Sequence, residues 1–314
     1  MKKIGYLLLL GATATWAQSA PNTSAAGPAT PEGTVSTTAN FPLQRVQMPT
    51  YADVYCAGFI NRQTLPDAHF VGGGLETPST TKFVRGDIVY LYGSGYTPGA
   101  EYEIIRALRD INEYEMFPGQ RKLLKSTGQP YMEVGRVRIV DTRSKTAVAH
   151  VEYSCDPINL GDTAIPFAEK TMVAFHPPLR FDVFLPTGSK VSGRIVMAKD
   201  FDAELGTGQK VYINVGSNQG VKVGDYFRIF RFTGTQHETD YQTPRYAFDM
   251  EQGDAVKDVG VLGFGAVPKK WDWNNTPRED LGEGIVLRTG PNSSTVLITF
   301  TLREIFPGDY VEVE

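Results

Sequence analysis

The chain has few residues whose types and spacing are typical of catalysis. Its four histidines are scattered: His69, His150, His176 and His237. None of them forms a His-x-His or His-x-x-x-His pair, and a metal site needs several ligands that converge on one point. A Gly-x-Ser-x-Gly nucleophile motif is also absent from the sequence. We therefore expect no catalytic residues, no metal and no cofactor.

The chain has two cysteines, Cys56 and Cys155. In an exported protein a pair of cysteines favours a disulfide, and two buried thiols are the alternative. The alternation of its strand places Cys155 in register with Leu302, which we expect to face the core. We predict that Cys155 pairs with Cys56 where the first and last strands of a small closed barrel meet.

Aromatic side chains supply the best candidates for binding. They lie between Thr233 and Asp280, and the residues concerned are Tyr241, Tyr246, Trp271 and Trp273. Exposed tryptophans stack on sugar rings or anchor partner proteins. The alternative is that they cover the core of their own domain, and the sequence leaves both interpretations open.

A Gly-Asp pair recurs at four places: Gly86-Asp87, Gly161-Asp162, Gly224-Asp225 and Gly308-Asp309. Glycine tolerates positive φ, and aspartate bonds nearby backbone, as turns before strands require. We interpret all four pairs as turns rather than ligand-binding motifs.

These residues must be positioned by a duplicated β-rich module. Leu281–Val311 aligns without a gap with Val134–Ala164, 147 positions earlier. Within this alignment Ala147, Ala149, Val151 and Tyr153 match Ser294, Val296, Ile298 and Phe300. A shared period of two predicts strands that turn the same face to the core in both copies.

Other segments complete the prediction. Asp53–Ile60 favours a strand, and Tyr102–Arg106 is also expected to be one, because Gly99–Arg106 matches the β-forming Gly224–Arg231. A short helix is expected around Gln120–Ser126. The stretch from 233 to 280 is about twice as long as its counterpart in the first copy, which is typical of a functional loop.

The N-terminus predicts export. Residues 1–17 combine a basic start with a short apolar run, as a signal peptide does. Residues 18–50 are rich in Ser, Ala, Thr and Pro and predict a flexible, disordered tether. No later segment is apolar enough for an integral membrane span. A net charge of −4 without a basic run argues against nucleic acid as a partner.

The 314 residues have room for two domains. We expect a first β-barrel module over 51–168, a Pro- and aromatic-rich connector over 169–188, and a second module over 189–314 with the 233–280 insertion. The fold class is thus mainly β, with two tandem small SH3-like β-barrels from an internal duplication.

Two runs carry a resemblance to known families. The first run is Val211–Gly216 with Gly220–Arg231, and the second is Leu281–Val311 with its Gly308-Asp309 turn. Both runs resemble the C-terminal SH3-like barrel of the flagellar H-ring assembly protein. The second run also resembles barrels attached to lysin-motif proteins. The whole chain resembles exported acidobacterial proteins through Val54–Phe59, Tyr153–Asp156 and Pro277–Gly284. The resemblance implies the barrel fold and brings no catalytic residues.

We therefore expect a non-enzymatic structural or adaptor protein in the periplasm or on the cell surface of a Gram-negative-type bacterium. Its partners would be envelope proteins or copies of itself. The alternative is a peptidoglycan-binding module that uses the aromatic 233–280 stretch. A buried cluster of perturbed carboxylates or histidines in a cleft would instead indicate a hydrolase.

Overall fold

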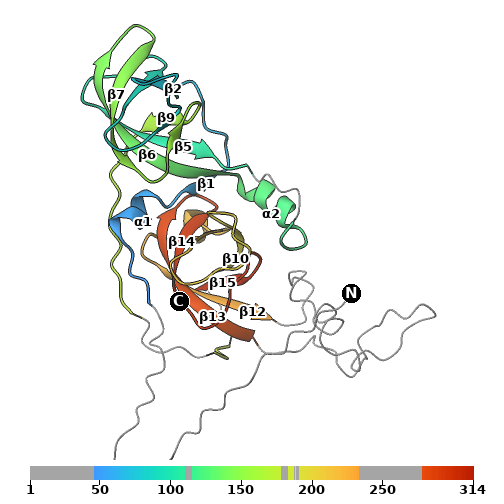
Figure 1. Ribbon diagram of the computed structural model, residues 1–314. Coiled ribbons are helices and arrows are strands. Elements are labelled where there is room, and N and C mark those ends of the chain that lie inside the picture. Colours follow the sequence, from blue (N-terminus) through green and yellow to red (C-terminus); the bar gives the residue numbers. More distant parts are fainter. Residues whose placement is uncertain (1–45, 110–114, 178–182, 187, 189–190, 233–277) are drawn as a thin grey trace, which may run out of the picture. The chain divides into compact units, whose positions relative to one another are not determined.

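The computed structural model describes residues 46–109, 115–177, 183–186, 188, 191–232 and 278–314 (Figure 1). These residues all belong to one compact unit that spans Gln44–Glu314. The predicted signal peptide, the tether up to residue 45 and most of the 233–280 insertion lie outside them.

The first module is a closed antiparallel barrel. Its strands are β2 (Phe70–Gly74), β4 (Ile88–Tyr92), β5 (Glu101–Ala107), β6 (Gln129–Thr142), β7 (Thr146–Ser154) and β9 (Thr163–Pro166). They follow the order β6-β5-β9-β2-β4-β7, and pairing of β7 with β6 closes the circle. The short strand β1 (Phe59–Asn61) adds to β6, and β3 (Lys82–Phe83) pairs with β8 (Ile158–Asn159).

The second module repeats this arrangement. Its strands are β10 (Ser192–Ala198), β11 (Lys210–Ile213), β12 (Tyr226–Phe232), β13 (Arg278–Thr289), β14 (Ser294–Thr301) and β15 (Tyr310–Val313). They form a closed barrel in the order β10-β11-β14-β13-β12-β15. When the strands are matched in chain order, this order equals that of the first barrel. The predicted mainly β fold with two tandem barrels is confirmed.

The predicted alternation is confirmed at its centre. Ala149 and Val151 of β7 are buried in the first barrel, and their counterparts Val296 and Ile298 of β14 are buried in the second. The phase of the apolar residues therefore determines which face of each strand lines a barrel core, as a period of two requires.

All four Gly-Asp pairs form turns, as predicted. The glycines have φ between 86° and 101°. Each aspartate carboxylate accepts a hydrogen bond from the backbone N–H three residues earlier, at 2.7–2.8 Å. The pairs are therefore structural: glycine permits the reversal and aspartate satisfies a backbone donor at its start.

The strand predicted over Asp53–Ile60 is wrong in its first half. Residues Tyr51–Tyr55 form helix α1, and only Phe59–Asn61 is a strand. The helix forms because Thr50 and Asp53 make a reciprocal capping box, in which the Thr50 hydroxyl accepts from the Asp53 N–H and the Asp53 carboxylate accepts from the Thr50 N–H. This local pairing outweighs the β-forming tendency of Val54 and Tyr55.

The two other local predictions are confirmed. Tyr102–Arg106 lies within strand β5, and helix α2 spans Gln120–Thr127. A 3-10 turn, η1, adds Ser217–Gln219 in the second module. Among the described residues, no helix is both long enough and apolar enough to cross a bilayer.

The disulfide between Cys56 and Cys155 is present, but its predicted setting is wrong. Cys56 follows the last turn of α1, and Cys155 follows the end of β7. The bond thus joins a helix end to a strand end. Leu302, the counterpart of Cys155, is 37% exposed because β14 ends at Thr301, so this position does not face the core.

Candidate functional site

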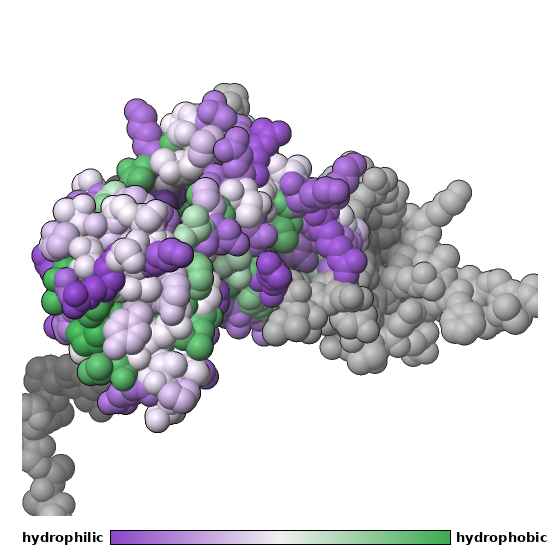
Figure 2. All heavy atoms as spheres, turned by 90° about the horizontal axis from the view of Figure 1, so that it is seen from above, coloured by the Kyte–Doolittle hydropathy of each residue, from purple (hydrophilic) through white to green (hydrophobic). Residues whose placement is uncertain are grey.

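The four aromatic candidates, Tyr241, Tyr246, Trp271 and Trp273, lie outside the described residues. The described residues offer two cavities, a set of buried ion pairs and an extensive contact between the modules. Apolar patches also interrupt the polar surface on the face shown in Figure 2.

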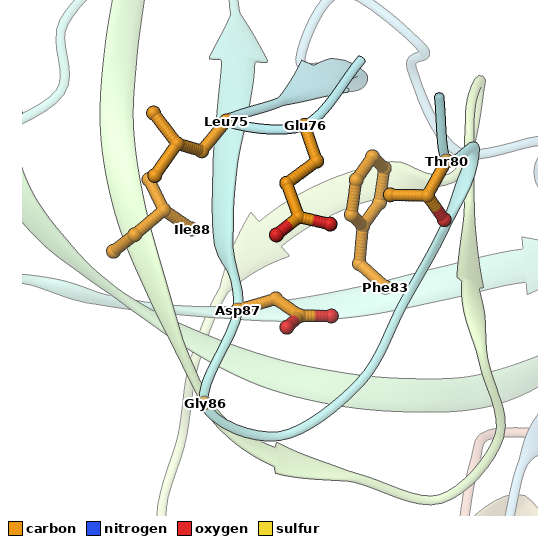
Figure 3. A pocket seen from close by; sticks show the side chains of 7 residues that line it. All are labelled: Leu75, Glu76, Thr80, Phe83, Gly86, Asp87 and Ile88. Atoms are coloured by element: carbon orange, nitrogen blue, oxygen red, sulfur yellow. The ribbon is translucent and has the colours of Figure 1, made fainter. Parts of the chain in front are cut away.

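The first cavity is small and lies at the start of β4. It has a volume of about 160 Å³. The carboxylates of Glu76 and Asp87 point toward one another across it, with Phe83 to one side and Leu75 and Ile88 to the other (Figure 3). Its volume lies below the roughly 300–1,000 Å³ of typical small-molecule sites. It has room for a small group, and buried Phe83 does not expose a ring face on which a sugar could stack.

The second cavity occupies the corresponding end of the second barrel. It measures about 490 Å³, and its lining residues are Glu204, Leu205, Gly206, Thr301, Leu302, Arg303 and Glu304. Leu205 bridges to Ile305 as Phe83 pairs with Ile158 in the first barrel. The duplication therefore includes this strand bridge, but of the residues that line the two cavities only Phe83 and Leu205 are equivalent.

The described histidines lie apart, each against a different neighbour. His69 packs edge-on against Tyr96, with ring centroids 5.0 Å apart, and His176 stacks on Tyr226 at 4.0 Å. His150 lies 3.7 Å from Glu152. Within the described parts of the chain, no group of His, Cys, Asp or Glu has the arrangement of a metal site.

An ion pair between a partly buried arginine and a buried aspartate recurs in both barrels and was not predicted from the sequence. Arg106 of β5 donates two hydrogen bonds to Asp162, both at 2.8 Å, and Arg231 of β12 donates two to Asp309 at 2.8 and 2.7 Å. Both aspartates belong to Gly-Asp turns. The recurrence of Arg106 as Arg231 in the aligned copies is the signal that the sequence offers, and it identifies the repeated arginine but not its partner.

A second set of charges joins the two modules. Glu133 of β6, 1% exposed, accepts hydrogen bonds from Lys170 at 2.7 Å, from the Gly58 N–H at 3.0 Å and from Arg288 of β13. Lys170 also binds Glu103 at 2.9 Å. Two carboxylates and two cations thus balance, which offsets the cost of removing them from water.

Apolar and hydrogen-bonding contacts extend this junction. Ile60 and Leu108 of the first module pack with Val196, Met197 and Tyr212 of the second. In addition, Ser293 and Thr295 donate to the carbonyls of Ile60 and Gly58 at 3.1 and 2.8 Å.

The connection from β5 to β6 also contacts the second barrel. Buried Phe117 lies against Gly308 and beneath the guanidinium of Arg194, 4.7 Å from its ring centroid. The Gln120 amide of α2 donates to the carbonyl of Val196 at 2.9 Å.

The carboxyl group of Glu283 on β13 has a strongly raised pKa. Burial raises its pKa to about 7, and the nearby carboxylate of Glu314 adds to the shift. His176 and Arg228 oppose it, and the Thr299 hydroxyl lies 3.4 Å away. Glu283 lines neither of the two cavities described above.

In comparisons with known proteins, the chain matches no family model and no curated protein.

Proposed function

We propose that the chain is a non-enzymatic structural or adaptor protein of the cell envelope that acts through protein–protein contacts of its duplicated barrels. Its place would be the periplasm or the cell surface. The observation that best supports the proposal is the way the buried charged residues are used. The Arg–Asp pairs and the Glu133 cluster each join separate segments of the fold, so their burial is explained by architecture.

Two further features agree with this proposal. The Cys56–Cys155 disulfide is consistent with an oxidising compartment outside the cytosol. The barrel fold also occurs twice in the chain, and repeated modules build extended binding surfaces in other proteins.

Peptidoglycan binding is the alternative, and the aromatic sequence of the 233–280 stretch favours it. Trp271 and Trp273 flank Asp272, and such closely spaced tryptophans suit stacking on sugar rings. Under this alternative, replacing both tryptophans by alanine abolishes binding to isolated cell-wall sacculi. Under the structural proposal, the same replacement leaves sacculus binding unchanged.

The deciding experiment is a pull-down of the tagged mature protein from its own envelope after mild cross-linking, followed by analysis of proteins and muropeptides. We expect protein partners, or ladders of the chain itself, in a fixed ratio to the bait. Muropeptides without stoichiometric protein would favour the alternative. Recovery of neither would contradict both functions.

A further inference from the structure

We propose that the outer face of the first barrel around Phe70, Tyr92 and Leu160 is a docking surface for a second copy of this chain. The inference rests on the proposed structural function and names its partner. It follows from a comparison of the two barrels, because the equivalent face of the second barrel is already covered by a segment of the first module.

The two faces correspond residue by residue. In the first barrel Val71 pairs with Leu91 and Gly73 with Tyr90, with a bulge between them. In the second barrel Ile195 pairs with Ile213 and Met197 with Tyr212, with the same bulge. Phe70 and Tyr92 therefore correspond to Arg194 and Asn214. The glycine turns also match, since Gly161 N–H donates to Val71 O and Gly308 N–H donates to Ile195 O, both at 2.8 Å.

On the second barrel this face is covered. Phe117 lies over Gly308 and Arg194, while Leu123 and Leu124 pack against the cluster that contains Val196, Met197 and Tyr212. As a result Val196 and Tyr212 are fully buried, although they point out of the barrel. Phe117, Leu123 and Leu124 come from the connection between β5 and β6, and Ile60 of β1 packs against the same cluster.

On the first barrel the same face is exposed and apolar. Leu160 is 42% exposed, whereas its counterpart Pro307 is buried, and Gly161 is exposed where Gly308 is buried. Phe70 and Tyr92 stack at 5.5 Å with their rings nearly parallel, and they are 37% and 44% exposed. The second barrel has a polar Arg–Asn pair at these two positions. At these two positions the uncovered face is the more apolar of the two, and exposed apolar side chains are typical of an interaction site.

The established contact between the modules indicates the occupant. In this contact the β5–β6 connection of one barrel covers the β10–β11 face of the next. The connection equivalent to β5–β6 in the second barrel joins β12 to β13. If the same contact is repeated, that connection meets the β2–β4 face of another copy. The interface is then head-to-tail, with different surfaces on the two partners, and it can extend to longer assemblies.

Self-association of the purified mature chain tests this inference by sedimentation velocity over a wide concentration range. We expect association that Leu160→Glu weakens at least about tenfold, as for a residue in the core of an interface. Val140→Glu is the matched control, because Val140 is also exposed but lies on β6, across the barrel from β2. A monomer at every concentration, or equal weakening by both variants, would overturn the inference.

A photo-cross-linking residue at position 160 identifies what covers the face. In an equal mixture of isotope-labelled and unlabelled chains, we expect mixed cross-links to residues 233–277 of the other copy. Cross-links only within one chain would overturn the inference. The same photo-cross-linking residue, used in the protein within its own envelope, distinguishes self-association from the adaptor function. Capture there of another protein and never of a second copy would overturn this inference and leave the adaptor function standing.

Discussion

Asp162 and Asp309 each accept hydrogen bonds from two sources. One is the backbone N–H three residues earlier in the Gly-Asp turn, and the other is an arginine on a neighbouring strand. The aspartate therefore fixes both the turn and its position against the barrel. Because the carboxylates are 4% and 2% exposed, loss of an arginine leaves a buried charge without its main partner.

Arg231→Met is expected to lower the free energy of unfolding by about 3–5 kcal/mol, the cost of breaking a buried ion pair on one side. Urea denaturation followed by circular dichroism measures it. Arg303→Met is the control, because Arg303 is 62% exposed in its pair with Glu279 and exposed pairs contribute at most about 1 kcal/mol. Equal effects of the two variants would contradict this account of Asp309.

Glu283 predicts a pH dependence of stability. Its pKa is raised in the folded state to about 7 from an ordinary 4.5, so the folded protein holds this proton more tightly than the unfolded chain. The free energy of unfolding therefore falls as pH rises from about 4.5 to about 7 and then levels off.

Glu283→Gln keeps the shape of the side chain and removes its charge. We expect it to raise the free energy of unfolding by about 2 kcal/mol at pH 8 and to change little at pH 4. Thermal denaturation at both pH values is the measurement. A gain of the same size at pH 4 would show that the charge of Glu283 is not its cause.

At the scale of elements, the β5–β6 connection covers one of two equivalent glycine turns. Gly161 and Gly308 both have positive φ, but only Gly308 lies beneath Phe117. A Cβ at position 308 would come within 2.8 Å of the Phe117 ring, while one at 161 would have no heavy atom within 4 Å. The same substitution thus tests the turn alone in one barrel and the turn plus the contact between modules in the other.

Gly161→Ala is expected to cost about 1 kcal/mol, the usual penalty for a positive φ. Gly308→Ala should cost about 1–3 kcal/mol more, because the added methyl group must displace Phe117 from a packed site. Chemical denaturation of both variants gives the comparison. Equal losses would mean that Phe117 does not pack closely on the second barrel.

At the scale of the whole molecule, the contact between the modules predicts cooperative unfolding. The Glu133 cluster and the apolar cluster around Tyr212 both combine residues from the two barrels. Unfolding of the first barrel would expose Tyr212 of the second barrel. Unfolding of the second barrel would leave Glu133 of the first without Arg288. We expect a single calorimetric transition in which the calorimetric and van't Hoff enthalpies agree. Two resolved transitions would show that the barrels unfold independently.

The disulfide adds to the stability of the same unit. Its cysteines are 99 residues apart, so the bond constrains a long stretch of the unfolded chain. Replacing both cysteines by serine is expected to lower the free energy of unfolding by about 4 kcal/mol. Denaturation of the variant and of the wild type under reducing conditions should agree. A stable variant with an unchanged denaturation midpoint would contradict this role.

Much of the architecture follows from the sequence alone. The period of two in β7 and β14, the four Gly-Asp turns and the gapless match of the copies predict duplicated β modules, because each depends on local geometry and on which face is apolar. The capping residues Thr50 and Asp53 are also present in the sequence, but the β-forming residues that follow them led to the prediction of a strand instead of a helix. The pairing of Cys56 with Cys155 followed from their number and not from their actual positions.

Only the tertiary structure decided which residues meet across the chain. Barrel closure brings Arg106 to Asp162, and the contact between modules brings Glu133 to Arg288. Neither pair is marked by a characteristic spacing in the sequence. The tertiary structure also decided that Val196 is covered while Leu160 is exposed, although they lie on equivalent faces of the two copies. Duplication makes the two barrels alike in sequence pattern, but a residue's burial depends on the neighbour that packs against it.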